Sequence, residues 1–236
     1  MKNFGAQNMV SSLKKVLMKK PQKFMSKVDT QKWNYIAPLD QYLINENYND
    51  FYKIIKNSGA EIVELGLEDE NEELCDSIFT HDPSLVLNEG AIILNMGKQL
   101  RKKETLAHKK FYDSINIPII GSIINDGTVE GGDCLWINNT TLLVGESYRT
   151  NKSGIDQLHE ILKLLNIKLI PIKLHKYNNK GSCFHLMSVI SMLDHDLAIV
   201  CEKLLPFDLK DILKKNEIEL INIPEDEYFK SNTLAV

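Results

Sequence analysis

Three short polar motifs of the sequence could do chemistry, because each sets ionisable side chains within an otherwise apolar stretch. They are CDSIFTHDP (75–83) with Asp76 and Asp82, TVEGGD (128–133) with Glu130 and Asp133, and GSCFHLMS (181–188) with His185. The glycine pair of the second motif suggests a bend, or a place where a ligand or another backbone comes close. Clustered carboxylates repel one another and need a cation to offset the cost of burial. No metal-ligand pattern is visible in the sequence, which favours a cation that belongs to the substrate.

Each of these residues also has an ordinary structural interpretation. Asp82 before Pro83 is a common turn pair, and Asp133 could bond backbone amides in its glycine turn. A lone histidine such as His185 on an apolar strand is more often a core group than a catalyst. The positions of the motifs within a repeat, however, favour a shared role.

A repeated pattern of one helix followed by one strand runs along the chain. The helix-like stretches are 45–59, 102–116, 153–166 and 208–216, and the strand-like runs that follow them begin near Glu61, Pro118, Lys168 and Glu219. The period is close to fifty residues, which is typical of blade-like or arrayed architectures. Further short strands lie between these pairs: SLVLN, AIILNMG, CLWI, TLLVGE and LAIVCE. Such units predict several small sheets with helices outside rather than one continuous sheet.

The three motifs lie at equivalent places in this repeat. CDSIFTHDP lies at the start of the second unit, TVEGGD at the start of the third and GSCFHLMS at the start of the fourth. In a closed ring of units, equivalent edges point toward one axis. The pattern therefore predicts that a set of residues far apart in sequence converges on one cavity: Asp76, Asp82, Glu130, Asp133 and His185.

Composition narrows the class of protein. The chain of 236 residues is 43% apolar, enough for a substantial core, and its formal net charge of -4 gives no general attraction to nucleic acid. No apolar run approaches the length of a membrane span. The four cysteines form no CxxC pair, which favours reduced thiols and a cytoplasmic location. The lysine-rich start of the chain contains KVLMKKP (15–21), which predicts a strand ended by Pro21 rather than a targeting peptide.

A family resemblance follows from the motifs. FTHDP (79–83), EGGD (130–133), the histidine of FHLMS (184–188) and the RTN of GESYRTN (145–151) occur in the order and rough spacing of the guanidine-modifying superfamily. The chain resembles the arginine deiminase and dimethylarginine dimethylaminohydrolase branch over nearly its whole length. The resemblance implies an α/β fold, a five-bladed pseudo-symmetric αβ propeller of ββαβ-type units. Residues 1–236 would form a single domain of this type that is C-terminally incomplete, with four units present and the fifth mostly missing.

The resemblance also implies a reaction: hydrolysis of the guanidino C–N bond of arginine or a methylated arginine to citrulline plus amine or ammonia. A cysteine thiolate attacks the central carbon, and a histidine protonates the departing amine and then activates the water that releases the product. Carried over by motif, Asp82 and Glu130 would bind the planar guanidinium, and Glu130 would also orient His185. His185 would be the general acid and base, and Asp76 a further polar group of the pocket.

Two arginines and the expected partners complete this interpretation. Arg101 and Arg149 resemble the arginines of the family that grip the substrate's α-carboxylate, although Arg101 lies in a basic run (RKK) and Arg149 could simply cap a loop. The resemblance implies no cofactor and no metal. The expected partner is a small-molecule guanidino substrate, with neither nucleic acid nor a membrane, and a homodimer is compatible with the family.

Departures from the family pattern bear on substrate and mechanism. Deiminases of free arginine typically have arginine where this chain has His81, and aspartate where it has Met187. Loss of an acid that would bind unsubstituted nitrogens favours a substituted guanidine, although Met187 is equally a packing residue. None of the four cysteines stands where the family has its nucleophile, which is expected beyond residue 236, and Cys183 is expected in the core. An amidinotransferase on the same scaffold, or a non-catalytic arginine-binding module, remain alternatives.

Overall fold

The computed structural model describes residues 4–66, 74–174 and 184–228, which form small mixed sheets with helices around them. The first unit pairs β1 (Lys15–Met18) in parallel with β2 (Glu61–Glu64), and α1 (Thr30–Trp33) and α2 (Gln41–Asn57) lie between them in sequence. Asp40 begins α2, because its carboxylate accepts the backbone N–H groups of Tyr42 and Leu43.

The other three units share one plan, ββαβ. The second consists of β3 (Ser84–Val86), β4 (Ala91–Ile93), α3 (Glu104–Ser114) and β5 (Ile119–Ser122). The third consists of β6 (Cys134–Asn138), β7 (Thr141–Glu146), α4 (Lys152–Lys163) and β8 (Lys168–Lys173). The fourth consists of β9 (Ile190–Asp194), β10 (Leu197–Val200), α5 (Phe207–Lys215) and β11 (Glu219–Asn222), followed by α6 (Glu225–Tyr228). In each, the middle strand pairs antiparallel with the first strand and parallel with the third.

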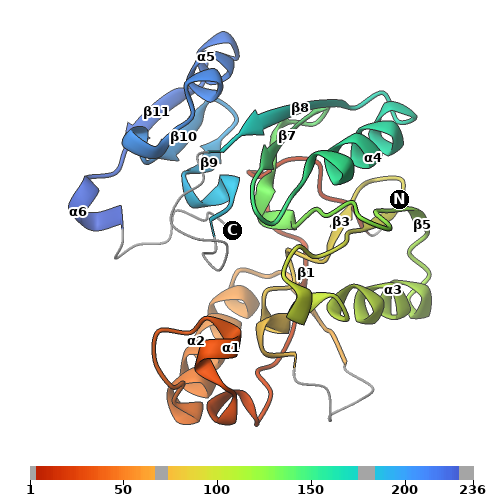
Figure 1. The fold of residues 1–236 in the computed structure, drawn as a ribbon, viewed down its shortest axis with the longest axis vertical. Helices are drawn as coiled ribbons and strands as arrows, with labels where there is room; N and C mark the ends of the chain where they lie inside the picture. Colours follow the sequence, from red (N-terminus) through yellow and green to blue (C-terminus); the bar gives the residue numbers. More distant parts are fainter. Residues whose placement is uncertain (1–3, 67–73, 175–183, 229–236) are drawn as a thin grey trace.

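These units match the repeat expected from the sequence. The helices α2, α3, α4 and α5 lie along the periphery, with most strands nearer the middle (Figure 1). The described ranges contain four sheets, one for each expected unit. A fifth unit was also expected to begin at the end of the chain, but residues 229–236 lie outside the described part.

Neighbouring units share their hydrophobic cores. One cluster joins Leu135 and Leu143 of the third unit to Met192 and Ala198 of the fourth. A second cluster joins the second unit, through residues such as Leu87, to the β6–β8 sheet and α4. Burying apolar surface between units holds their equivalent edges in fixed relative positions. No helix in the described ranges is long and apolar enough to cross a membrane.

The turn between helix and final strand is the same in all four units. Gly59, Asn116, Asn166 and Glu217 each adopt a left-handed conformation there, with φ between 57° and 86°. In the second, third and fourth units, the buried isoleucine that follows returns its N–H to a carbonyl of the last helical turn, at 2.9–3.1 Å. This geometry is a common helix stop, and it favours glycine or asparagine. Glu217 is therefore the residue of this set that fits its conformation least well.

We expect Glu217→Asn to raise the free energy of unfolding by about 0.5–1 kcal/mol, because asparagine tolerates the left-handed region better than glutamate. The reverse exchange in the equivalent turn, Asn166→Glu, should lower it by a similar amount. Urea denaturation of both variants measures this. Both positions are exposed, so altered packing would not explain the result. Equal stability of all three proteins would contradict the expected strain.

Candidate functional site

Glu130 lies at the centre of the candidate site, fully buried just before the turn Gly131–Asp133. Its Oε2 lies 3.0 Å from Nε2 of His185, and its Oε1 accepts the backbone N–H of Lys98 at 3.0 Å. Nη1 of Arg149 donates to the same carboxylate at 3.2 Å. Burial raises the pKa of Glu130, but the hydrogen bond from His185 and the charges of His185 and Arg149 outweigh it and lower the pKa below its ordinary value. Glu130 therefore carries a negative charge against the His185 ring.

Asp82 lies on the other side of the glycine pair. Its Oδ1 accepts the backbone N–H of Gly132 at 2.9 Å, and its Oδ2 accepts Nη1 of Arg101 at 2.6 Å. Burial raises the pKa of this carboxyl, but His185 and Arg101 nearby lower it to about 2. Asp82 is therefore ionised at neutral pH. The structure thus brings Asp82, Glu130 and His185 together, as the sequence predicted.

The glycine pair permits this close approach. A Cβ atom on Gly132 would lie 2.6 Å from Nδ1 of His185 and 3.2 Å from Oδ1 of Asp82. A Cβ on Gly131 would collide with the backbone carbonyl of His81. Neither glycine has a positive φ, so these positions require a missing side chain rather than unusual backbone freedom. The two glycines of the TVEGGD motif therefore leave space for Asp82 and His185 to pack directly against the backbone.

Asp133 fixes the backbone next to His185. It is fully buried, with Oδ1 accepting the N–H of Leu186 at 2.9 Å and Oδ2 accepting the hydroxyl of Ser147 at 2.8 Å. Burial raises the pKa of its carboxyl. Of the two interpretations of Asp133 from sequence, the structure therefore shows the amide-bonding one, directed at the residue after His185 rather than at its own turn.

Asp76 belongs to a cluster that the sequence did not reveal. It is buried, and its carboxylate accepts the hydroxyl of Tyr35 at 2.7 Å and Nζ of Lys98 at 2.7 Å. The same ammonium group donates to the carbonyl of Trp33 at 2.9 Å and lies 5.1 Å from the centre of the Trp33 ring. Lys98 thus contacts Asp76 through its side chain and Glu130 through its backbone. In the sequence it reads as one of several bases in GKQLRKK (97–103), so nothing local indicated its role.

The two candidate arginines both bind carboxylates of the protein. Arg101 is buried and contacts Asp82 and Glu104, so it does not lie on a solvated basic face. Arg149 is also buried and contacts Glu130 through Nη1. Their expected grip on a substrate carboxylate stays a prediction. The structure places both guanidinium groups at the acids that would face a guanidinium ligand.

The residues that depart from the family pattern are also placed. Met187 is buried in the core cluster of the third and fourth units, in agreement with a packing role. Nε2 of His81 lies 3.1 Å from the carbonyl of Gly131. Cys75, Cys134 and Cys201 are buried cysteines that form no disulfide with one another, and burial raises the pKa of Cys134 well above its ordinary value. Cys183 lies outside the described residues.

Within the described ranges, no group of three or more histidine, cysteine, aspartate or glutamate side chains could hold a metal ion.

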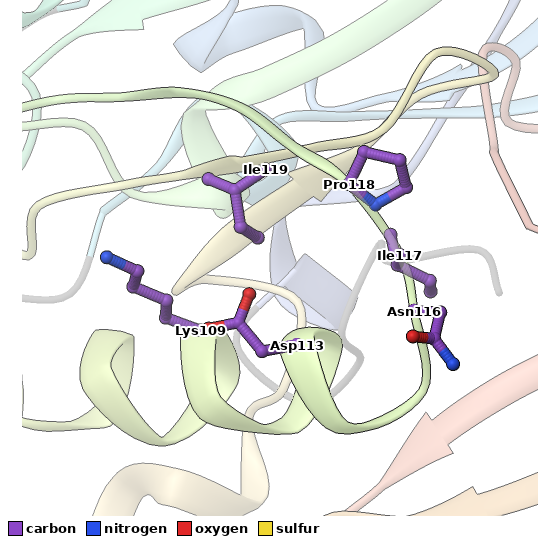
Figure 2. A pocket seen from close by; sticks show the side chains of 6 residues that line it. All are labelled: Lys109, Asp113, Asn116, Ile117, Pro118 and Ile119. Carbon is purple, nitrogen blue, oxygen red and sulfur yellow. The ribbon is translucent and has the colours of Figure 1, made fainter.

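Another recess lies between α3 and β5, bordered by Lys109, Asp113, Asn116, Ile117, Pro118 and Ile119 (Figure 2). None of the candidate site residues borders it, and it contributes no buried acid or histidine. The Asp82, Glu130 and His185 cluster is therefore the candidate functional site.

Three ββαβ units carry a buried acid or a histidine shortly before their first strands: Asp82 before β3, Glu130 before β6 and His185 before β9. The model of the arginine deiminase family matches residues 70–232, and the chain belongs to this family. An uncharacterized protein of Bacillus subtilis, YkgA, is 29% identical over 94% of this chain and 74% of its own length. The dimethylarginine dimethylaminohydrolase of Pseudomonas aeruginosa is 25% identical over 89% of this chain and 77% of its own length.

The solved structures confirm the fold. A mutant of the Pseudomonas aeruginosa dimethylarginine dimethylaminohydrolase, solved with citrulline, is similar with a TM-score of 0.77 and 24% identity. The match covers 94% of this chain and 80% of that one. The arrangement of small α/β sheets in this chain is therefore similar to that of this relative.

We expect Gly132→Ala to lower the free energy of unfolding by roughly 1–3 kcal/mol, because the new methyl group must displace the His185 ring from Glu130. Urea denaturation gives the stability. The imidazole resonances of His185 in NMR spectra should shift in the same variant, which reports the loss of the Glu130 contact. Gly66→Ala is the matched control, because a Cβ there meets nothing within 4 Å. An unchanged His185 resonance in Gly132→Ala would contradict the steric argument.

Proposed function

We propose that the protein hydrolyses the guanidino carbon–nitrogen bond of arginine or a methylated arginine, releasing citrulline and ammonia or an amine. The observation that carries the proposal is the pair of ionised, buried acids Asp82 and Glu130 on either side of Gly131 and Gly132, with His185 bonded to Glu130. Membership of the arginine deiminase family and the name of the Pseudomonas relative support the same chemistry.

Asp82 is the acid proposed to bind the substrate directly. Each of its oxygens accepts one bond among the described contacts, from Gly132 and from Arg101. A carboxylate oxygen has two acceptor positions, so both oxygens can still accept N–H groups of a planar guanidinium. Glu130 already accepts bonds from three residues, so its contribution to binding is mainly its negative charge. Asp76 contributes a further polar group, although Lys98 neutralises it.

His185 is the proposed general acid and base. A thiolate adds to the central guanidino carbon, and His185 donates a proton to the leaving amine as the carbon–nitrogen bond breaks. Water then attacks the thiouronium carbon while His185 takes its proton, and the carbon–sulfur bond breaks to release the ureido product. Glu130 fixes the orientation of the ring and stabilises the imidazolium form through the 3.0 Å contact.

The nucleophile is proposed to be a cysteine thiolate that the described residues do not supply. Cys75, Cys134 and Cys201 are buried at 0–3% exposure, and the raised pKa of Cys134 keeps its thiol protonated, so none of them fits the role. The citrulline complex of the Pseudomonas relative is a cysteine-to-serine mutant, which points to a functional cysteine in that protein.

Substrate preference is proposed to lie with substituted guanidines. Met187 packs in the core and supplies no acid, so Asp82 and Glu130 are the acids available to the guanidinium. For the α-carboxylate, Arg149 is better placed than Arg101. Arg149 donates through Nη1 alone among the described contacts, whereas Arg101 uses all three of its nitrogens. Arg101 is retained as a weaker candidate for the same role.

We expect Asp82→Asn to weaken binding of dimethylarginine at least about tenfold, because a charge-assisted bond to the guanidinium is lost. His185→Gln should bind within a few-fold of the wild type and lose turnover. Isothermal titration calorimetry on the chain of 236 residues gives the affinities, and Asp113→Asn, an exposed aspartate, is the matched control.

Turnover is measured separately from binding. Release of citrulline from arginine or dimethylarginine supports the hydrolase. Binding without turnover would favour the arginine-binding module, and transfer of the amidino group to an added amine would favour the transferase. Failure to bind either ligand would overturn the proposal.

A further inference from the structure

Glu104, the first residue of α3, is a buried acid outside the motifs described above. Its side chain is 1% exposed and forms a two-pronged pair with Arg101. Nε of Arg101 lies 3.0 Å from both oxygens of Glu104, and Nη2 lies 2.8 Å from Oε2. Paired N–H groups on one carboxylate fix the plane of a guanidinium as well as its position. Glu104 therefore determines where the remaining nitrogen of Arg101 points.

The remaining nitrogen of Arg101, Nη1, donates a hydrogen bond to Oδ2 of Asp82 at 2.6 Å. The carbonyls of Asp76 and Phe79 accept Nη2 at 3.2 Å each and hold the same guanidinium from the side. Asp82 is thus fixed at both oxygens, by Arg101 and by the backbone of Gly132. A network of charged hydrogen bonds therefore runs from Glu104 through Arg101 to Asp82, the acid proposed to bind the substrate.

Negative groups outnumber positive groups in this network, because the single cation Arg101 contacts two acids. The ionisable groups that act on Glu104 are Arg101, Asp76 and Asp82, and burial raises its pKa to about 7 against the pull of Arg101. His108, one turn further along α3, bonds Ser84, and burial lowers the pKa of its ring to about 4, so it is neutral near pH 7. Because the pKa of Asp82 is about 2 and that of Glu104 is about 7, a proton taken up by this network binds to Glu104 and leaves Asp82 ionised.

We propose that Glu104 is a positioning residue for guanidinium binding: it holds Arg101 so that the Asp82 carboxylate keeps its orientation and its charge for the substrate. The inference rests on the proposed function. With Glu104 charged, the Arg101 cation is shared between two acids. With Glu104 neutral, Asp82 alone balances Arg101, so the substrate competes with Arg101 for the same carboxylate.

The test is the pH dependence of binding in Glu104→Gln, which keeps the size of the side chain and removes its charge. Isothermal titration calorimetry with dimethylarginine on the chain of 236 residues should give about tenfold weaker binding in the variant at pH 8. Towards pH 6 the two affinities should converge, because wild-type Glu104 then takes up a proton. A purely structural role for Glu104 would give a loss that does not depend on pH.

Asp113→Asn is the matched control, because it removes an exposed acid from the same helix. It should bind like the wild type at every pH. If Glu104→Gln does not fold, as judged by circular dichroism, Glu104→Asp replaces it. That variant keeps the charge and should keep the rise in affinity between pH 6 and 8, with binding a few-fold weaker.

Each remaining outcome overturns the inference. Equal affinity of Glu104→Gln and wild type at pH 8 would show that Glu104 does not act on Asp82, and the proposed hydrolase would stand. If the affinity of Glu104→Asp did not rise between pH 6 and pH 8, that result would also show that Glu104 does not act on Asp82. If the wild type binds neither dimethylarginine nor arginine, the proposed function fails and the role of Glu104 falls with it.

Discussion

The burial of several carboxylates around a pair of glycines is the constraint on which this structure depends. Isolated buried acids would take up protons, since removing a charge from water is costly. Here Arg101 contacts Asp82 and Glu104, Arg149 contacts Glu130, and Lys98 contacts Asp76. Removal of any one of these cations would leave an uncompensated acid in a region with little water. The charges of Arg101 and Arg149 therefore help to keep Asp82 and Glu130 ionised.

The repeat makes this arrangement possible, because each unit contributes a different part of the cluster from the same edge. Asp82 precedes β3, Glu130 precedes β6 and His185 precedes β9. The glycines of the third unit then let its turn approach Asp82 and His185 from the neighbouring units. Shared hydrophobic clusters fix the relative positions of the units, so atoms from three units meet with hydrogen-bond accuracy. Stability and site geometry consequently depend on the same packing.

Much of the fold and part of the site could be predicted from the sequence. Local periodicity indicated α2, α3, α4 and α5 but not the short α1 and α6. The helix-to-strand turns have a local cause in left-handed residues such as Asn116 and Asn166. Asp82, Glu130 and His185 were found because each stands in a short motif. β9 was not predicted. Lys98 and Glu104 were also missed, because their partners lie in other parts of the fold and nothing in GKQLRKKE (97–104) separates a buried base from a solvated one.

The balance of charge in the cluster bears on how a guanidino hydrolase would work. The carboxyls of Asp82 and Glu130 both have lowered pKa values, so both are ionised at neutral pH. Two ionised acids close to one histidine favour a ligand that brings positive charge. A guanidinium substrate supplies that charge, whereas a ureido product such as citrulline is neutral at the reacting group. Conversion of one into the other would remove the main attraction between ligand and site, so the reaction itself would favour product release.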